Sequence, residues 1–230
     1  MIGAIDIETI PNPEMVDKLP PPKVDSRLKD PAKIAAAEST AKAKQVEKMG
    51  LDPMYARVLC WSMVGSVGTS GHGPEDEAQE HAEIIPAMTD EAERAILQSA
   101  FNVLGQDDAR LITWNGNGFD LPFVYKRALV LGINPADFGA PPLAAWTKRY
   151  NTDRHYDLMQ IWGGWSSQGM EKLDVVARAV LGEEKQDMDF KLFPVLMLTP
   201  EGRAKITEYC LQDSRLTWRL WNRFKGVLFA

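Results

Sequence analysis

Two carboxylates interrupt an isoleucine-rich segment at the start of the chain, residues 2–9. Its apolar residues, with Gly3 and Pro11 as boundaries, predict a buried β-strand. Because side chains alternate across a strand, Asp6 and Glu8 point to the same face. Neighbouring carboxylates repel each other, so a buried strand that carries both favours a bound cation, and a divalent metal ion is the simplest one. The alternative is a chance pair, since Asp-x-Glu is expected about once in a chain of this length.

The composition is that of a globular protein. The chain has 230 residues, of which 45% are hydrophobic, enough for the core of one large domain or two small ones. The formal net charge of -6 argues against a broad, non-specific nucleic-acid surface. Local basic patches or bound metal ions could still admit a polyanion, so the charge does not exclude a nucleic-acid substrate.

Cysteine usage and hydropathy indicate the compartment. Cys60 and Cys210 lie far apart and have no metal-ligand spacing, which favours free thiols in a reducing environment. The first predicted strand begins almost at Met1, so no signal peptide is expected, and no apolar run approaches the roughly 18 residues of a membrane helix. We therefore expect a soluble, cytoplasmic protein.

The hydrophobic periodicity predicts an α/β fold in which a mixed sheet is flanked by helices. Three strands are followed by a helix, a strand and a helix, and the second half is mainly helical. A Gly/Ser-rich turn through Gly73 joins the second and third strands. Further strands are expected at 57–64, 82–85 and 109–114, and helices at 90–104, 121–131, 156–162, 171–181 and 200–226.

Residues 20–56 form a predicted insertion in a single domain that spans residues 1–230. Asp30 followed by Pro31 is a helix-start signal, and the helix should end near Met49 and Gly50. Its apolar stripe is thin, so we expect the insertion to pack loosely on the domain. The helix is slightly basic, and a solvated helix without a role is the alternative.

A third carboxylate, Asp120, lies in the glycine-rich loop 115–123, between a predicted strand and a predicted helix. Such strand ends are where open α/β sheets bind their ligands. The alternative is structural, because an Asp just before Leu-Pro is a good helix N-cap.

A fourth carboxylate, Asp213, falls within the apolar stripe of the last predicted helix. A carboxylate on a buried helix face needs a partner. Tyr209 precedes it by four residues and therefore lies on the same face. An ion pair between Asp213 and a basic residue such as Arg178 or Arg203 is the alternative to a metal site.

These residues, taken in order, resemble the motifs of a known family, the DEDD 3'-5' exonucleases with the ribonuclease H-like fold. Asp6-Ile-Glu8-Thr resembles the first motif, Asn115-Gly-Asn-Gly-Phe-Asp120 the second, and Tyr209-x-x-x-Asp213 the third. The tyrosine is typical of the DEDDy subgroup. Within it the likeness is to the proofreading-type exonuclease domain of family B DNA polymerases, here without a polymerase.

The resemblance implies two-metal hydrolysis of phosphodiester bonds with two Mg²⁺ or Mn²⁺ ions. Asp6, Glu8 and Asp213 would hold one ion, while Asp6, together with Asp120 directly or through water, would hold the second. Tyr209 would orient the attacking water, because a phenol with a reference pKa of about 10 is a poor base at neutral pH.

The implied substrate is the 3' end of single-stranded nucleic acid, with DNA expected, in proofreading or repair. Thr9, Asn115 and Phe119 are the candidate contacts to the terminal nucleotide, although a core position is the alternative for Phe119. A polymerase or another replication or repair protein is a possible partner. The alternative functions are an RNA-directed ribonuclease H-like nuclease and a catalytically silent nucleic-acid-binding module. The stretch 185–190 also resembles a family loop, but with Phe190 where a glycine is expected. The segment 155–158 resembles one that such proteins carry before the middle helices, and Asp157 is predicted to be only the N-cap of the following helix.

Overall fold

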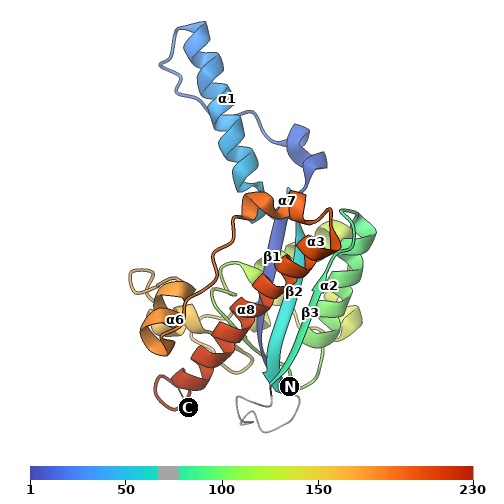
Figure 1. Cartoon of the computed structure of the whole chain (residues 1–230), viewed down its shortest axis with the longest axis vertical. Coiled ribbons are helices and arrows are strands. Elements are labelled where there is room, and N and C mark those ends of the chain that lie inside the picture. The colour runs from blue at the N-terminus through green and yellow to red at the C-terminus, as the bar shows by residue number, and fades with distance from the viewer. Residues whose placement is uncertain (67–77, 230) are drawn as a thin grey trace.

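A five-stranded mixed sheet organises the computed structural model, which describes residues 1–66 and 78–229 (Figure 1). The strand order is β3-β2-β1-β4-β5, with β1 antiparallel to β2 and parallel to β4. The predicted turn through Gly73 lies outside the described residues. The strands are β1 (Ile2–Pro11), β2 (Ala56–Ser66), β3 (Gln79–Ile84), β4 (Arg110–Thr113) and β5 (His155–Asp157).

Helices cover both faces of the sheet, as the α/β prediction required. On one face, Ile5 and Ile7 of β1 belong to a core that includes side chains of α2 (Asp90–Leu104) and α3 (Asp120–Leu131). On the other, Ala4 packs in a core with α6 (Leu173–Leu181) and α8 (Pro200–Phe224). Alternation therefore directs Asp6 and Glu8 toward the α8 side of the sheet.

The last helix, α8, crosses β1 and β2 (Figure 1). Its N-cap is Thr199, whose side chain accepts a hydrogen bond from the Gly202 amide, and Pro200 occupies the first turn. The predicted apolar stripe is buried, and so is Asp213 within it, which is 6% exposed. The helix has 25 residues, but neither it nor any other helix in the described ranges is long and apolar enough to cross a membrane.

The helix predicted after Asp30 projects away from the sheet as α1 (Pro31–Lys48; Figure 1). Asp30 caps it by accepting a hydrogen bond from the Ala32 amide, and none of the residues of α1 is buried. The base of this arm is anchored by Met49, which is 1% exposed, and by a 2.6 Å hydrogen bond from the Thr9 hydroxyl to the Gly50 carbonyl.

The region after α3 differs from the prediction. Residues 155–157 form β5, which pairs in parallel with β4, so the predicted helix 156–162 is shortened to α5 (Leu158–Trp162). A three-residue strand is too short to show periodicity, and its pairing with β4 decides its conformation. Several short helices were also not predicted: η1 (Pro13–Lys18), η2 (Met49–Leu51), η4 (Pro135–Phe138), α4 (Leu143–Trp146), η5 (Phe190–Leu192) and α7 (Phe193–Leu196).

A buried ion network joins α2, α3 and β2. The Glu93 side chain is 0% exposed and accepts hydrogen bonds from Arg127 Nη2 at 2.6 Å and from the Val58 amide at 2.9 Å. Arg57 Nη1 lies 3.4 Å from the same carboxylate. The two guanidinium groups thus compensate the buried negative charge.

Candidate metal centre

Asp6 and Glu8 meet Asp213 between β1 and α8. One carboxylate oxygen from each residue lies within 4.8 Å of the other two. Ser62 of β2 is the sheet partner of Asp6, and its hydroxyl donates a hydrogen bond to the Cys210 carbonyl of α8 at 2.8 Å. This hydrogen bond helps to hold α8 against the sheet beside Asp6. Residues more than 200 positions apart in sequence are thereby brought to one point.

The electrostatics of this cluster suit a divalent cation. Burial, together with the charge of Asp213, raises the pKa of both Asp6 and Glu8 well above the ordinary range. Within residues 1–66 and 78–229, the buried Asp213 Oδ1 has no hydrogen-bond partner. A cluster of oxygen ligands with one oxygen left unsatisfied fits a divalent cation, because bound positive charge would offset the repulsion.

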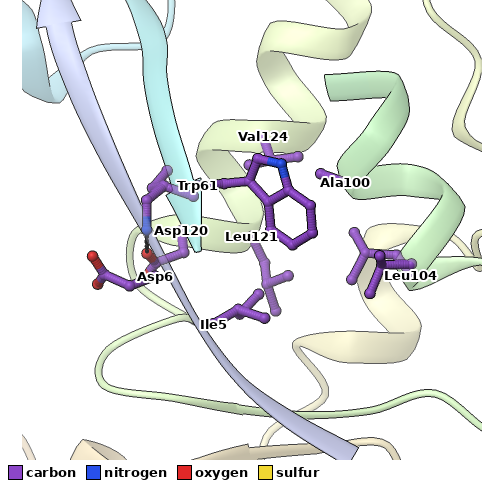
Figure 2. Close-up of a pocket in the computed structure, with 10 residues that line it drawn as sticks. Ile5, Asp6, Trp61, Ala100, Leu104, Asp120, Leu121 and Val124 are labelled. Atoms are coloured by element: carbon purple, nitrogen blue, oxygen red, sulfur yellow. Dashed lines mark hydrogen bonds between the residues drawn. The ribbon is translucent and has the colours of Figure 1, made fainter. Parts of the chain in front are cut away.

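Asp120 lies beside this cluster but is turned toward the backbone of β1. Its Oδ1 accepts a hydrogen bond from the Ile7 amide at 3.3 Å (Figure 2), and it is not a member of the three-carboxylate group. Burial raises the pKa of Asp120 to about 7. The N-cap alternative for Asp120 is wrong, because Phe119 occupies that position and Asp120 is the first residue of α3. Together with Asp6, Asp120 also lines a mainly apolar pocket between β1, β2, α2 and α3 (Figure 2).

Asp157, predicted from the sequence only as a helix N-cap, also holds the loop before Asp120. Asp157 caps α5 as predicted, accepting from the Gln160 amide at 3.2 Å. It also accepts from the amides of Asn115 at 3.2 Å and Asn117 at 2.9 Å, which fixes the loop. Gly116 is required here, because a Cβ would come within 2.3 Å of the Thr113 hydroxyl. The only sequence signal was the position of Asp157 at a helix start.

His155 supports the same loop from β5. Burial lowers the pKa of His155 to about 4, so the ring is neutral at pH 7. A neutral ring can donate from Nδ1 to the Trp146 carbonyl at 3.1 Å and accept at Nε2 from the Thr113 hydroxyl at 2.7 Å. Thr113 Oγ1 in turn accepts from the Gly116 amide at 3.0 Å. This chain of hydrogen bonds connects the first residue of β5 to the loop that carries Asp120.

The basic partner of Asp213 is Lys185, which the sequence did not identify. Its ammonium forms an ion pair with Asp213 Oδ2. The ion-pair alternative for Asp213 is therefore confirmed, but the two example partners are wrong. Arg178 lies 3.7 Å from Glu184, and Arg203 donates to the Met197 carbonyl at 2.9 Å. Burial lowers the pKa of Lys185, but the charge of Asp213 more than offsets this, so the net shift is upward. In the sequence, Lys185 was noted only as the first residue of the stretch 185–190. Its contact with Asp213 depends on how this stretch packs against α8.

Tyr209 lies one helical turn before Asp213, as its spacing predicts. Its side chain faces the Lys185 ammonium, which lies 5.0 Å from the centre of the phenol ring. Burial raises the pKa of Tyr209 to about 12, so the phenol remains protonated at neutral pH. The hydroxyl can therefore donate a hydrogen bond beside the carboxylate cluster.

The three predicted substrate contacts have different surroundings. The hydroxyl of Thr9 is used in the hydrogen bond to Gly50. Asn115 adopts a left-handed backbone conformation with φ of 73°, which Asn tolerates better than most residues. Phe119 is partly buried against the core, with its ring centre 5.3 Å from that of Phe123.

The metal-free protein is expected to lose stability as the pH rises from 5 to 7.5. The pKa of Asp120 is about 7 in the folded chain and about 4 when unfolded. Unfolding therefore releases protons in this window, and the free energy of unfolding falls as pH rises through the folded pKa. Thermal denaturation in EDTA measures the decline, and the Asp120→Asn variant should reduce it by at least about 1 kcal/mol. An identical pH profile for both proteins would contradict the assigned shift.

Comparison with known proteins shows which family the chain resembles. Residues 56–228 match a family described as a predicted 3'-5' exonuclease related to the exonuclease domain of PolB. The DNA polymerase catalytic subunit of Epstein-Barr virus (strain B95-8) is 32% identical over 154 residues, covering 58% of this chain and 15% of that protein. DNA polymerase 1 of Aeropyrum pernix is 30% identical over 147 residues, covering 60% of this chain and 14% of that protein.

The fold comparison covers more of the chain. The structure of the family B DNA polymerase from Pyrobaculum calidifontis superposes with a TM-score of 0.60 at 18% identity, over 96% of this chain and 24% of that one. The chain thus spans only a small part of the polymerases it matches. It belongs to the family of predicted 3'-5' exonucleases related to the exonuclease domain of family B DNA polymerases.

Proposed function

We propose that this protein is a metal-dependent 3'-5' exonuclease that shortens single-stranded DNA from its 3' end. The observation that carries the proposal is the convergence of Asp6, Glu8 and Asp213, with ligand oxygens within 4.8 Å of one another in a buried site. Family membership supports the reaction, and the names of the related polymerases support DNA as the substrate.

Four carboxylates are the proposed metal ligands. Asp6, Glu8 and Asp213 would hold one Mg²⁺ or Mn²⁺, and Asp6, with Asp120 directly or through water, would hold a second. When bound, the ions supply charge stabilisation at the attacking and leaving oxygens and make water a better nucleophile. Glu8, Asp120 and Asp213 are buried, so packing restricts their side chains, which favours an ordered ligand set.

The remaining polar residues prepare the site. Tyr209, protonated because its pKa is about 12, would hydrogen-bond the attacking water and orient it. Lys185 neutralises part of the negative charge of the cluster in the metal-free protein through its pair with Asp213. Asp157 and His155 hold the loop that carries Asp120, so they act as positioning residues.

Contacts to the substrate are proposed from residues around the loop and the end of β1. Thr9, Asn115 and Phe119 would contact the terminal nucleotide. Thr9 would do so from a position fixed by Gly50, and Asn115 from the loop held by Asp157. Because the related proteins are DNA polymerases, a polymerase or another replication or repair protein is proposed to deliver the 3' end.

A 5'-labelled single-stranded oligonucleotide tests the proposed activity directly. With Mg²⁺ or Mn²⁺, we expect a ladder of products that shorten from the 3' end, and EDTA should abolish it. Internal cuts or exclusive cleavage of an RNA oligonucleotide would instead support the ribonuclease H-like alternative. Binding without cleavage in the presence of either metal would support a catalytically silent module.

Replacing Tyr209 with Phe should lower kcat by about 10²-fold without weakening metal binding, because the variant loses only the hydroxyl that orients water. Single-turnover cleavage measures the first effect, and calorimetric titration with Mn²⁺ measures the second. Tyr125→Phe is the matched control, since Tyr125 on α3 is also buried but donates to the Pro141 carbonyl away from the cluster. Equal losses of turnover and Mn²⁺ affinity would show that Tyr209 has a different role.

A further inference from the structure

An exposed aromatic ring lies at the edge of the candidate metal centre. Phe190, the first residue of η5, is 54% exposed. Its ring centre is 5.9 Å from that of Tyr209, and the two rings meet at 79°. We propose that Phe190 is a stacking platform for a base near the 3' end of the single-stranded substrate. This inference rests on the proposed exonuclease function and deepens it.

The position of the ring is fixed from several sides. Phe193, which is 1% exposed, meets the Phe190 ring edge to face with ring centres 5.3 Å apart. Asp189 caps η5 by accepting from the Lys191 amide at 3.0 Å. Lys191 also pairs with Glu47 of α1 at 2.9 Å, although both side chains are exposed, so this pair adds little. A ring held by Phe193 and Tyr209 loses little conformational freedom when a base stacks on it.

The chemistry around Phe190 suits a nucleotide. Single-stranded nucleic acids are bound by aromatic rings that stack on bases, together with positive charge along the backbone. The ammonium of Lys185, which pairs with Asp213, lies 5.0 Å from the centre of the Tyr209 ring, so positive charge is close to the ring that Phe190 contacts.

Phe190 fits this role better than the other aromatic residue proposed to contact the substrate. Phe119 is partly buried and packs on Phe123, so little of its ring is free to stack. Phe190 instead exposes more than half of its surface while it contacts the tyrosine that is proposed to orient the attacking water. Each base has an aromatic face, so such a platform would bind any sequence.

The test uses the full chain with Phe190→Leu, which keeps an apolar side chain but removes the aromatic face. We expect KM for a single-stranded oligonucleotide to rise about tenfold, with kcat changed less than twofold. Phe190→Trp should restore the wild-type KM. Leu192→Ala is the matched control, because Leu192 is 50% exposed on the same short helix but has no aromatic face.

Oligonucleotides with an abasic residue at one of the last three positions identify the stacked base. In the wild type, an abasic residue at the stacked position should raise KM about tenfold. In Phe190→Leu, an abasic residue at the same position should raise KM no further. Equal KM values for the wild type and Phe190→Leu would overturn the proposal. If the wild type itself produces no ladder, the proposed exonuclease function is wrong. In that case, the fluorescence anisotropy of a labelled oligonucleotide, measured without metal for the wild type and Phe190→Leu, still decides whether Phe190 binds a base.

Discussion

Asp6→Ala is expected to reduce cleavage by about 10³-fold or more, since a lost metal ligand removes several kcal/mol of charge stabilisation from the transition state. Asp6 is the one residue proposed to contact both metal ions. The protein should nevertheless fold, and its metal-free form should be at least as stable as the wild type. Burial, followed by the charges of the neighbouring carboxylates, raises the pKa of Asp6, so removing this carboxyl group relieves an unfavourable buried charge.

Three measurements check this expectation. Initial rates on a labelled oligonucleotide give the loss of activity, Mn²⁺ titration gives the loss of metal binding, and thermal denaturation in EDTA gives stability. Asp107→Ala is the control, since Asp107 is an exposed carboxylate far from β1 in sequence. Near-normal cleavage by Asp6→Ala would refute the proposed mechanism, whereas an unfolded variant would show that Asp6 has a structural role.

Glu93→Gln is expected to destabilise the fold by about 3–5 kcal/mol, because it leaves the buried guanidinium group of Arg127 without its negative partner. Arg127 makes two short hydrogen bonds to Glu93, at 2.6 and 2.8 Å, and has an exposed fraction of only 3%. Arg57 keeps a second partner in Asp90, so most of the penalty should arise at Arg127. The network lies on the face of the sheet opposite the carboxylate cluster, so the chemistry itself should not change.

Urea denaturation gives the free energy of unfolding of Glu93→Gln. Glu91→Gln, an exposed position on the same helix, should stay within about 0.5 kcal/mol of the wild type. The folded fraction of Glu93→Gln should retain its metal affinity at low temperature. A destabilisation below about 1 kcal/mol would mean that the arginines find other partners or reach water.

Local sequence patterns predicted the elements that carry the candidate site. β1 was recognisable from its isoleucines, and α8 from the apolar stripe of the helix predicted at 200–226. These signals are local, because periodicity and capping depend on residues within a few positions of each other. The grouping of Asp6, Glu8 and Asp213 around one ion was implied by the resemblance to the DEDD exonucleases, and the structure brings their oxygens within 4.8 Å of one another.

Other features depend on contacts that local patterns do not contain. β5 exists through its pairing with β4, and Lys185 reaches Asp213 across 28 residues. The hydrogen bond from the Ile7 amide to Asp120 likewise forms only because α3 packs against β1. Asp157 looked like a simple helix cap, yet two of its hydrogen bonds hold the loop of the second motif.

The sequence by itself determined the α/β class, the carboxylates and tyrosine of the candidate site, and the family to which the chain belongs. Side-chain chemistry and periodicity are properties of the chain itself, so they can be recognised before it folds. Only the tertiary structure decided that three carboxylates share one buried point, that Lys185 pairs with one of them, and that Phe190 stands exposed beside Tyr209. These relations join segments separated by up to about 200 residues, and they arise only when helices pack onto the sheet and exclude water from their contacts.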